Sequence, residues 1–427
     1  MKSFLDKIFF RSNNLDYVSQ NIKDLSRKKP IQKIFEAVNS HSLDSEIRYV
    51  GGCIRKIIIK EKVDDIDLAT NIEPKNICDA LYKNNIDFYE SGKEHGTITA
   101  MIDEYKFEIT TLREDIFTDG RHAKVKFSKD WKKDASRRDF TINSIYSDKD
   151  GNLFDPYEGK KDLENGFINF IGNADIRIKE DYLRILRYLR FFLNYSKQAH
   201  NAEINKKKKI NIGGISKLSK ERLIDELQKI IKLPTLEKLS KDKMSLELFL
   251  IIFPELKNVK IFSQLNSYYK DLLKENDFIF LLSLLVIDDN DNLDYFLYKY
   301  NISKKDQKRI KIIDNFYKEK INSKTFTANN LNKVFYYYGK EATIDILNHR
   351  IFKSKRVDNS LKELIEYYEN SKVLVLPVSA DSLMKKYEIP EGKLLGEKLK
   401  KIEEEWIKNN FKITSERIKE IIQFHTN

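Results

Sequence analysis

The stretch VGGCIRKIIIKEKVDDIDLAT, residues 50–70, contains the pattern that decides the fold. Its apolar start predicts a short strand that runs into Gly51 and Gly52, and a helix is predicted to follow. Glycines at such a junction let the backbone approach a phosphate closely, and a helix N-terminus favours negative charge. Arg55 lies in the first turn, where a cation is disfavoured unless an anion binds. The segment therefore predicts either a triphosphate-binding turn or a plain strand-to-helix connection.

Carboxylates recur along the second predicted strand, residues 66–70. Asp65 and Asp67 are two residues apart, so both project from one face of the strand. Neighbouring carboxylates repel each other unless a cation lies between them, and Mg²⁺ accepts a few carboxylates together with water and phosphate oxygens. Glu108, within KFEITT, alternates with apolar residues on a further strand. We predict Mg²⁺ binding at Asp65 and Asp67, with Glu108 as a third catalytic carboxylate; an exposed acidic strand face is the alternative.

The composition limits the class of protein. The chain has 427 residues, a formal net charge of +12 and a pI of about 9.1. It is long enough for two or more cores, and the basic excess favours a polyanionic partner, although a lysine-rich genome gives the same excess. Two cysteines predict a reducing compartment, with the bacterial cytoplasm expected and a mitochondrial location left open. The longest apolar run, 278–287, is too short to cross a bilayer and predicts a buried helix.

The order of the patterns predicts an α+β fold. Mixed strand and helix signals, including a hairpin of strands at 97–102 and 106–112, fill the chain to about residue 155. Beyond residue 176 the apolar spacing is helical almost to the end. The lysine run 206–209 is predicted to be a loop, and Pro234 and Pro377 are predicted breaks. A mixed-sheet head is therefore expected before an all-α portion.

Several motifs follow the DxD sequence in a fixed order. They are GKEHGTITAMI (92–102), KFEITTLRED (106–115), TDGRHAKVKF (118–127), RRDFTINSIY (137–146), FDPYEGKKDL (154–163), EDYLRILRYLRF (180–191) and SKERLIDEL (219–227). Together with residues 50–70 this series resembles the class II tRNA nucleotidyltransferase and bacterial poly(A) polymerase branch of the nucleotidyltransferase superfamily. The resemblance is strong from about residue 47 to 230. Lys56 departs from it, because the family usually has Asp after the first arginine.

The resemblance implies a fold with a head, neck, body and tail. We expect an N-terminal extension at 1–29, a catalytic head at 30–175, a neck at 176–235, an RNA-binding body at 236–375 and a tRNA-binding tail at 376–427. It also implies tRNA, CTP and ATP as partners, with no membrane. The expected nucleotide-binding residues are Gly51, Gly52, Arg55, Arg138, Asp139, Asn143, Asp181, Arg184, Arg187 and Arg190.

One motif has a chemistry suited to choosing a base. Asp181, Arg184, Arg187 and Arg190 recur every three residues, which places them in one polar stripe if the segment is a single helix. A carboxylate only accepts hydrogen bonds and a guanidinium only donates them. Asp181 and Arg184 therefore match the amino group and acceptors of cytosine or adenine, whereas guanine and uracil present a carbonyl to Asp181. The resemblance implies that this pair is the protein template; a salt-bridged amphipathic helix is the alternative.

The polar stretch from residue 113 to 137 is predicted to be a long loop without secondary structure. Its charged residues Arg113, Asp119 and Arg121 are expected to act as a flexible loop that reshapes the pocket between C and A addition. A disordered surface loop is the alternative.

The motifs together favour template-independent addition of CCA to the 3′ end of tRNA. A poly(A) polymerase shares the first two motifs, but GKEHGTIT and the intact loop are closer to the tRNA-specific branch. An enzyme that adds only CC or only A stays open. A non-catalytic RNA-binding protein would be expected to lack one of the carboxylates, and Asp65, Asp67 and Glu108 are all present.

Overall fold

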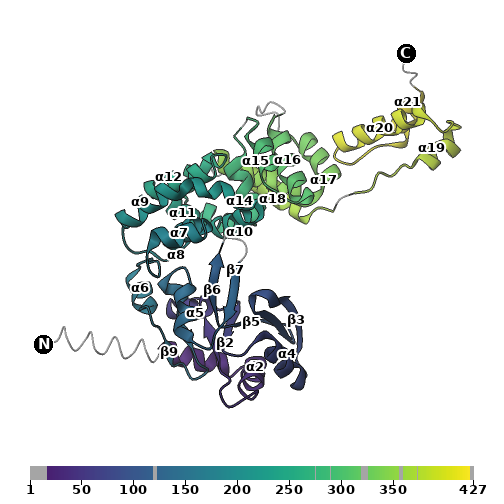
Figure 1. Ribbon diagram of the computed structural model, residues 1–427. Coiled ribbons are helices and arrows are strands. Elements are labelled where there is room, and N and C mark those ends of the chain that lie inside the picture. Colours follow the sequence, from purple (N-terminus) through teal and green to yellow (C-terminus); the bar gives the residue numbers. More distant parts are fainter. Residues whose placement is uncertain are drawn as a thin grey trace. The chain divides into compact units, whose positions relative to one another are not determined.

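The computed structural model describes residues 17–118, 123–274, 276–288, 290–318, 326–354, 359–372 and 374–423. The chain forms two compact units, one made of residues 1–230 and 242–252 and the other of 231–241 and 253–427 (Figure 1). The first contains a β-sheet and helices, and the second is helical, so the α+β class is confirmed. Among the described residues, no helix has the length and apolar content needed to span a membrane.

A mixed sheet forms the centre of the first unit. Within the described residues its seven strands have the order β3-β4-β5-β2-β1-β8-β9. All neighbouring pairs are antiparallel except β2 and β5, which are parallel. The strands are β1 (Ile47–Val50), β2 (Ile66–Thr70), β3 (Asp87–Gly92), β4 (Thr97–Ile102), β5 (Tyr105–Thr111), β8 (Tyr146–Ser147) and β9 (Leu153–Phe154). The predicted hairpin is thus β4–β5, and β3 adds an edge strand that the sequence reading missed.

The parallel pairing of β2 with β5 brings the predicted carboxylates together. Asp67 is the register partner of Glu108, and Ile66 and Leu68 on either side of Asp67 are buried. Because side chains alternate along a strand, Asp67 and Glu108 project from the face opposite these apolar residues. The sheet therefore supplies two adjacent carboxylates without any contribution from a loop.

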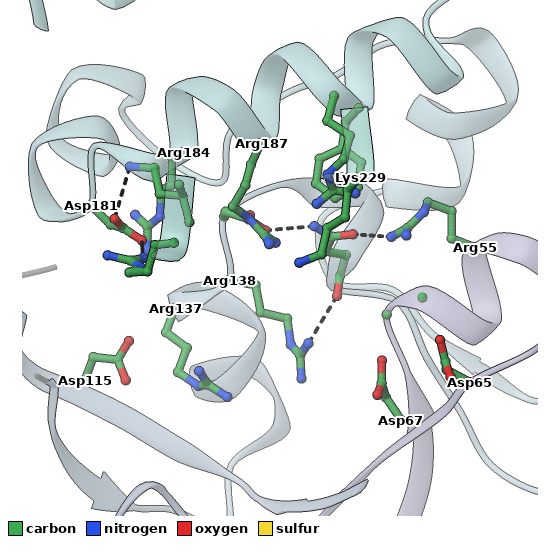
Figure 2. A pocket seen from close by; sticks show the side chains of 18 of the residues that line it. Arg55, Asp65, Asp67, Asp115, Arg137, Arg138, Asp181, Arg184, Arg187 and Lys229 are labelled. Atoms are coloured by element: carbon green, nitrogen blue, oxygen red, sulfur yellow. Dashed lines mark hydrogen bonds and ion pairs between the residues drawn. The ribbon is translucent and has the colours of Figure 1, made fainter. Parts of the chain in front are cut away.

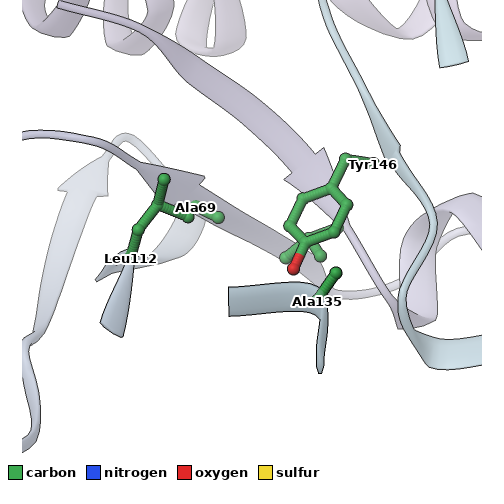
Figure 3. Packing of buried hydrophobic residues seen from close by; sticks show 5 residues of the cluster. Ala69, Leu112, Ala135 and Tyr146 are labelled. Atoms are coloured by element: carbon green, nitrogen blue, oxygen red, sulfur yellow. The ribbon is translucent and has the colours of Figure 1, made fainter. Parts of the chain in front are cut away.

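Helices cover the sheet. Helix α2 (Lys29–Asn39) packs against α4 (Pro74–Lys83), as Figure 1 shows, and against β1. Helix α3 (Gly52–Ile58) packs against β1 and β2. Residues 17–26 are also helical. Val50, Ala69, Leu112 and Tyr146 form a buried cluster with Ala135 of helix α5 (Trp131–Arg137), and Figure 3 shows the Tyr146 ring lying over Ala135. This cluster joins the sheet to helix α5.

The described parts of the segment, residues 113–118 and 123–137, contain two strands and a helix, so the prediction of a long irregular loop was wrong. Strands β6 (Arg113–Thr118) and β7 (Ala123–Phe127) pair as an antiparallel hairpin, and α5 (Trp131–Arg137) follows. Asp130 caps α5 by accepting hydrogen bonds from two backbone amides of the first turn. The polar composition hid the hairpin because the described side chains of β6 are only partly buried, and apolar alternation is therefore weak. Asp119 and Arg121 lie outside the described residues.

The predicted template stripe is not carried by one helix. Helix α7 (Ala174–Glu180) ends before Asp181, whose backbone is extended, and α8 (Leu183–Tyr195) begins after it. The Asp181 carboxylate accepts a hydrogen bond from the Leu183 amide at 3.1 Å, at the start of α8. Only the three arginines therefore share a helix. Asp181 projects from the junction between two helices, where its direction is set independently of theirs.

The lysine run 206–209 belongs to a helix, so its prediction as a loop was also wrong. It lies in α9 (Ala202–Asn211), which packs against α7. Lys208 is buried, with Nζ 4.0 Å from the centre of the Tyr188 ring. Burial lowers the pKa of Lys208 to about 7, although nearby Asp242 opposes this shift. The ring and the carboxylate offset part of the cost of desolvating the ammonium group.

The remaining helices of the first unit are α6 (Gly159–Asn165), α10 (Lys220–Ile230) and α12 (Lys243–Ile252). The second unit consists of α11 (Leu233–Lys241), α13 (Ser267–Lys274), α14 (Phe278–Val286), α15 (Asn292–Lys299), α16 (Lys304–Lys318), α17 (Ala328–Ser354), α18 (Asn359–Asn370), α19 (Ala380–Tyr387), α20 (Lys393–Lys408) and α21 (Ser415–Gln423). As predicted, the apolar run at 278–286 is a buried helix. The last helices enclose a core of Leu383, Leu395 and Ile402.

Replacing Lys208 by Met is expected to raise the free energy of unfolding at pH 7 by on the order of 1 kcal/mol, because an apolar side chain needs no desolvation of charge. The folded pKa of about 7 lies below the ordinary value of 10.5. Wild-type stability should therefore rise with pH between these two values, and the difference between the proteins should narrow. Urea denaturation at pH 7 and pH 9 measures both effects. Lys209→Met, at an exposed lysine of the same helix, is the control. If Lys208→Met were less stable than wild type at pH 7, burial of the Lys208 charge would not be the dominant cost at this position.

Candidate functional site

A cavity of about 680 Å³ in the first unit gathers most of the predicted site residues. Figure 2 shows Asp65 and Asp67 toward one end, Asp181 and Arg184 toward the other, and Arg138 and Arg187 between them. Of the predicted residues that the structure describes, Glu108 is absent from its lining. The others line it: Gly51, Gly52, Arg55, Asp65, Asp67, Arg113, Arg138, Asp139, Asn143, Asp181, Arg184, Arg187 and Arg190.

The glycine turn opens the cavity to a ligand. Gly51 precedes the first turn of α3 and has a φ of +68°, a backbone conformation that residues other than glycine rarely adopt. A Cβ at Gly52 would lie 3.6 Å from the Asp67 carboxylate and 3.9 Å from an Arg55 nitrogen. The two glycines therefore keep space free between the helix N-terminus and the acidic end of the cavity.

The acidic end fits a divalent cation. Burial raises the pKa of Asp67, and the charges of Glu108 and Asp65 raise it further, while Arg138 and Arg55 oppose them. A bound cation would relieve this repulsion. Glu108 is about half exposed and pairs with Lys106 at 3.2 Å. Among the described residues, no group of three His, Cys, Asp or Glu side chains forms a metal site by itself. An ion here would need ligands from substrate or water, which is how Mg²⁺ is commonly held.

Arg55 is fixed at the rim of the glycine turn. It is 8% exposed and lies 5.0 Å from the Phe191 ring centre and 5.1 Å from that of Tyr195. It donates a hydrogen bond to the side-chain oxygen of Asn143. Asn143 in turn donates to Asp139 at 2.8 Å. In the seven-residue helix α3, Arg55 belongs to the last turn and not, as predicted, to the first, so the helix dipole does not disfavour its charge.

Two arginines of α8 form ion pairs with buried carboxylates. Arg187 Nε donates to Asp139 at 2.5 Å, and Arg190 Nε donates to Glu226 at 2.5 Å. Burial opposes ionisation of Asp139, but Arg187 and Asn143 outweigh it and hold the pKa of this carboxyl well below its ordinary value. Glu226 lies in the SKERLIDEL motif on α10. These pairs connect α8 with the RRDF segment and with α10.

The predicted base-reading residues each have a partner. Asp181 accepts a hydrogen bond from Arg222 at 2.8 Å, and Arg184 donates to Glu180 at 2.6 Å. Arg184 also donates to the Arg177 backbone carbonyl at 2.8 Å. Both side chains line the cavity. The hydrogen bonds just described hold one edge of the Asp181 carboxylate and one edge of the Arg184 guanidinium. The arrangement presents an acceptor and a donor in fixed directions.

The cavity also includes residues that the sequence reading did not select. Asp115, Arg137, Arg222 and Lys229 line it, as does Lys56. Arg113, at the start of β6, has its pKa lowered to about 10 by burial and by Arg137. The motif around Arg222 was visible in the sequence, but nothing there indicated which side chain would reach the cavity.

Lys56 stands where the resemblance described above leads us to expect Asp. Its Nζ lies 3.1 Å from Asp64, in the connection that leads to Asp65. The pair is partly exposed, so its contribution to stability is small. Lys56 therefore lies at the rim of the cavity as half of an ion pair, and Arg55 keeps its contact with Asn143.

Comparisons with known proteins agree in both units. Residues 47–169 match the family described as Poly A polymerase head domain, and residues 271–422 match the one described as tRNA nucleotidyltransferase domain 2. The mitochondrial CCA tRNA nucleotidyltransferase 1 of Danio rerio is 42% identical over 189 residues, which is 44% of each chain. This match thus spans less than half the length of that relative.

A longer match is found at lower identity. The CCA-adding enzyme of Streptococcus uberis is 28% identical over 375 residues, 84% of this chain and 87% of the relative. The fold resembles the crystal structure of the Bacillus stearothermophilus CCA-adding enzyme in complex with CTP. That likeness has a TM-score of 0.70 at 19% identity and covers 93% of this chain and 98% of the other.

Replacing Asp139 by Ala is expected to lower the free energy of unfolding at pH 7 by about 2 kcal/mol, because Arg187 and Asn143 lose a buried acceptor. The folded pKa of Asp139 is depressed, so its contribution is present above the ordinary pKa near 3.8 and is lost as the pH falls below it. The difference from wild type should therefore shrink in acid. Urea denaturation at pH 7 and pH 3.5 measures it. Asp24→Ala, which removes an exposed ion pair, is the control; equal effects of the two variants would refute the argument.

Proposed function

We propose that this chain, which belongs to the family of tRNA nucleotidyltransferases and poly(A) polymerases, adds C, C and A to the 3′ end of tRNA without a nucleic-acid template. The observation that carries the proposal is the single cavity with carboxylates at one end and the Asp181–Arg184 pair at the other. A nucleoside triphosphate has the matching polarity, with phosphates at one end and a hydrogen-bonding base at the other. The names of the matching relatives support CCA addition to tRNA.

The reaction would be attack of the tRNA 3′-hydroxyl on the α-phosphate of CTP or ATP, with release of pyrophosphate. Asp65 and Asp67 would hold Mg²⁺, and Glu108 would add negative charge beside Asp67. When bound, such a cation lowers the pKa of a hydroxyl group and stabilises charge that develops on phosphate oxygens. The carboxylates must be ionised to hold it, so activity should fall in acid.

The chain's own cations would hold the triphosphate. Arg55 and Arg138 lie beside the glycine turn and close enough to Asp67 to lower its pKa. The backbone amides of Gly51 and Gly52 begin α3 and favour an anion. Lys56, which pairs with Asp64, also lies at the rim. This group would orient the leaving pyrophosphate away from the incoming hydroxyl.

Asp181 and Arg184 would select the base. Asp181 accepts from the amino group that cytosine and adenine share, and Arg184 donates to a ring acceptor. Guanine and uracil present a carbonyl to Asp181, so binding would leave buried acceptors facing each other. The partners Arg222 and Glu180 support this role, because they restrict how the two side chains can turn.

Two alternatives are separated by product. A poly(A) polymerase would add long A tails, and a partial enzyme would stop after CC or add only A. The order of motifs and the hairpin β6–β7 favour full CCA addition. The head, neck, body and tail borders, the role of Arg113 in switching between bases and the bacterial cytoplasmic location stay predictions.

With tRNA transcripts that lack three, two or one terminal nucleotides, the wild-type protein is expected to restore CCA from CTP and ATP. Asp67→Ala should reduce every addition by at least about 10³-fold, because the cation site loses its most buried carboxylate. Asp79→Ala, a surface change on α4, is the control and should be fully active. Sequencing of the 3′ ends gives the products. Long A tails from wild type would exclude CCA addition as the activity.

Asp181→Ala is expected to lower the preference for CTP over UTP, and for ATP over GTP, by at least about tenfold while transfer persists. The reason is that the variant no longer opposes a carbonyl at the base-reading end. The ratios of kcat/KM for the four nucleotides measure the change. Asp225→Ala, on exposed surface of α10, is the matched control. If Asp181→Ala kept wild-type selectivity, the template assignment would be wrong.

A further inference from the structure

A buried carboxylate lies behind the cavity without lining it. Asp134 on α5 is 1% exposed. One of its oxygens accepts hydrogen bonds from Arg137 Nε at 2.8 Å and from the Arg113 backbone amide at 3.3 Å. The other accepts from Arg138 Nη2 at 3.2 Å and from the Tyr146 hydroxyl at 2.6 Å. Asp134 thus joins the start of the hairpin β6–β7 to two cavity arginines.

Tyr146 holds the same arginine from a second direction. Its hydroxyl accepts a hydrogen bond from Arg138 Nε at 2.9 Å while donating to Asp134. The ring is fully buried in the cluster with Ala135 and Leu112 (Figure 3) and meets the Trp131 ring edge-on at 5.5 Å. Because the ring cannot move without disturbing this core, the hydroxyl is a fixed point.

The two contacts determine which edge of Arg138 is offered to a ligand. Nε and Nη2 face Tyr146 and Asp134, whereas Nη1 lies beside the glycine turn, 3.7 Å from where a Cβ on Gly51 would be. Nη1 donates a long hydrogen bond, 3.4 Å, to the Asn143 backbone oxygen. Figure 2 shows the Arg138 guanidinium directed toward the end of the cavity that holds Asp67.

The charge of Asp134 is maintained although the group is buried. Desolvation opposes ionisation, but Arg138, Arg137 and the Tyr146 hydroxyl together hold the pKa of Asp134 well below its ordinary value. The carboxylate therefore stays an acceptor throughout the neutral range. One carboxylate is shared by two arginines, so a positive charge remains on the side that faces the cavity.

We propose that Asp134 and Tyr146 are positioning residues that preorganise Arg138 for the triphosphate of the incoming nucleotide. The inference rests on the proposed function for the nature of the ligand. A free arginine side chain loses rotamer freedom when it binds phosphate, whereas one already held at Nε and Nη2 loses little. The benefit is the same for CTP and ATP, because Arg138 lies at the phosphate end and not at the base-reading end.

The test is Tyr146→Phe, which keeps the ring in its core and removes only the hydroxyl. The dissociation constants of CTP, ATP and inorganic tripolyphosphate, measured by calorimetry without tRNA, should each rise about tenfold, since one hydrogen bond is worth about this factor. In the addition assay KM for both nucleotides should rise by a similar factor, with KM for tRNA unchanged. Asp134→Asn should raise the same three dissociation constants by more than Tyr146→Phe does.

The matched control is Tyr49→Phe. Tyr49 is equally buried in the adjacent strand β1, and its hydroxyl bonds Ser26, away from Arg138. Its removal should leave all three dissociation constants unchanged. Unchanged tripolyphosphate binding by a folded Tyr146→Phe protein, or a loss confined to one nucleotide, would overturn the inference. A wild-type protein that binds tripolyphosphate but adds no CCA would instead refute the proposed function.

Discussion

The parallel pairing of β2 with β5 is the constraint on which the site depends. It sets Asp67 beside Glu108 on one face, while Ile66, Leu68 and their neighbours anchor the opposite face in the core. The strand cannot slip by one residue without burying the carboxylate and exposing its apolar neighbours. The repulsion between the two acidic groups is therefore built into the sheet, and it adds to burial, the larger cause, in raising the pKa of Asp67.

Arginines line the rest of the cavity, and several of them pair with buried carboxylates. Asp139 serves Arg187, Glu226 serves Arg190, and Asp134 serves both Arg137 and Arg138. Buried guanidinium groups without such partners would carry a large desolvation cost. Each partner also fixes a direction, so the ionic network both stabilises the unit and defines which nitrogen atoms face the ligand.

Much of the site was predictable because it rests on local sequence patterns. Strand, glycine turn and DxD follow from alternation and turn chemistry within 20 or so consecutive residues. The errors arose where the deciding interaction is tertiary. The sequence predicts a solvated charge at Lys208, but its ammonium group is buried over the Tyr188 ring. Asp181 was expected to share a helix with the arginines, but it lies in the extended junction between α7 and α8. The polar segment after residue 112 gave no apolar alternation from which to infer β6 and β7. Asp134 was missed because its importance comes from contacts with Arg113 and Tyr146, which spacing alone does not indicate.

The distribution of partners suggests why the two ends of the cavity differ in chemistry. Arg187 and Arg190 are each bound to a carboxylate, which cancels much of their charge, and Arg184 is bound to Glu180. Arg55 instead donates to the neutral amide of Asn143, and Arg138 shares its carboxylate with Arg137. These two cations lie beside the glycine turn, close enough to Asp67 to lower its pKa, so this end of the cavity holds carboxylates and arginines together. At the other end, Glu180 is shared by Arg184 and Arg177, and Asp181 pairs with Arg222. Under the proposed function, directional hydrogen bonds at this end would distinguish one base from another, whereas attraction between charges would be shared by every nucleotide.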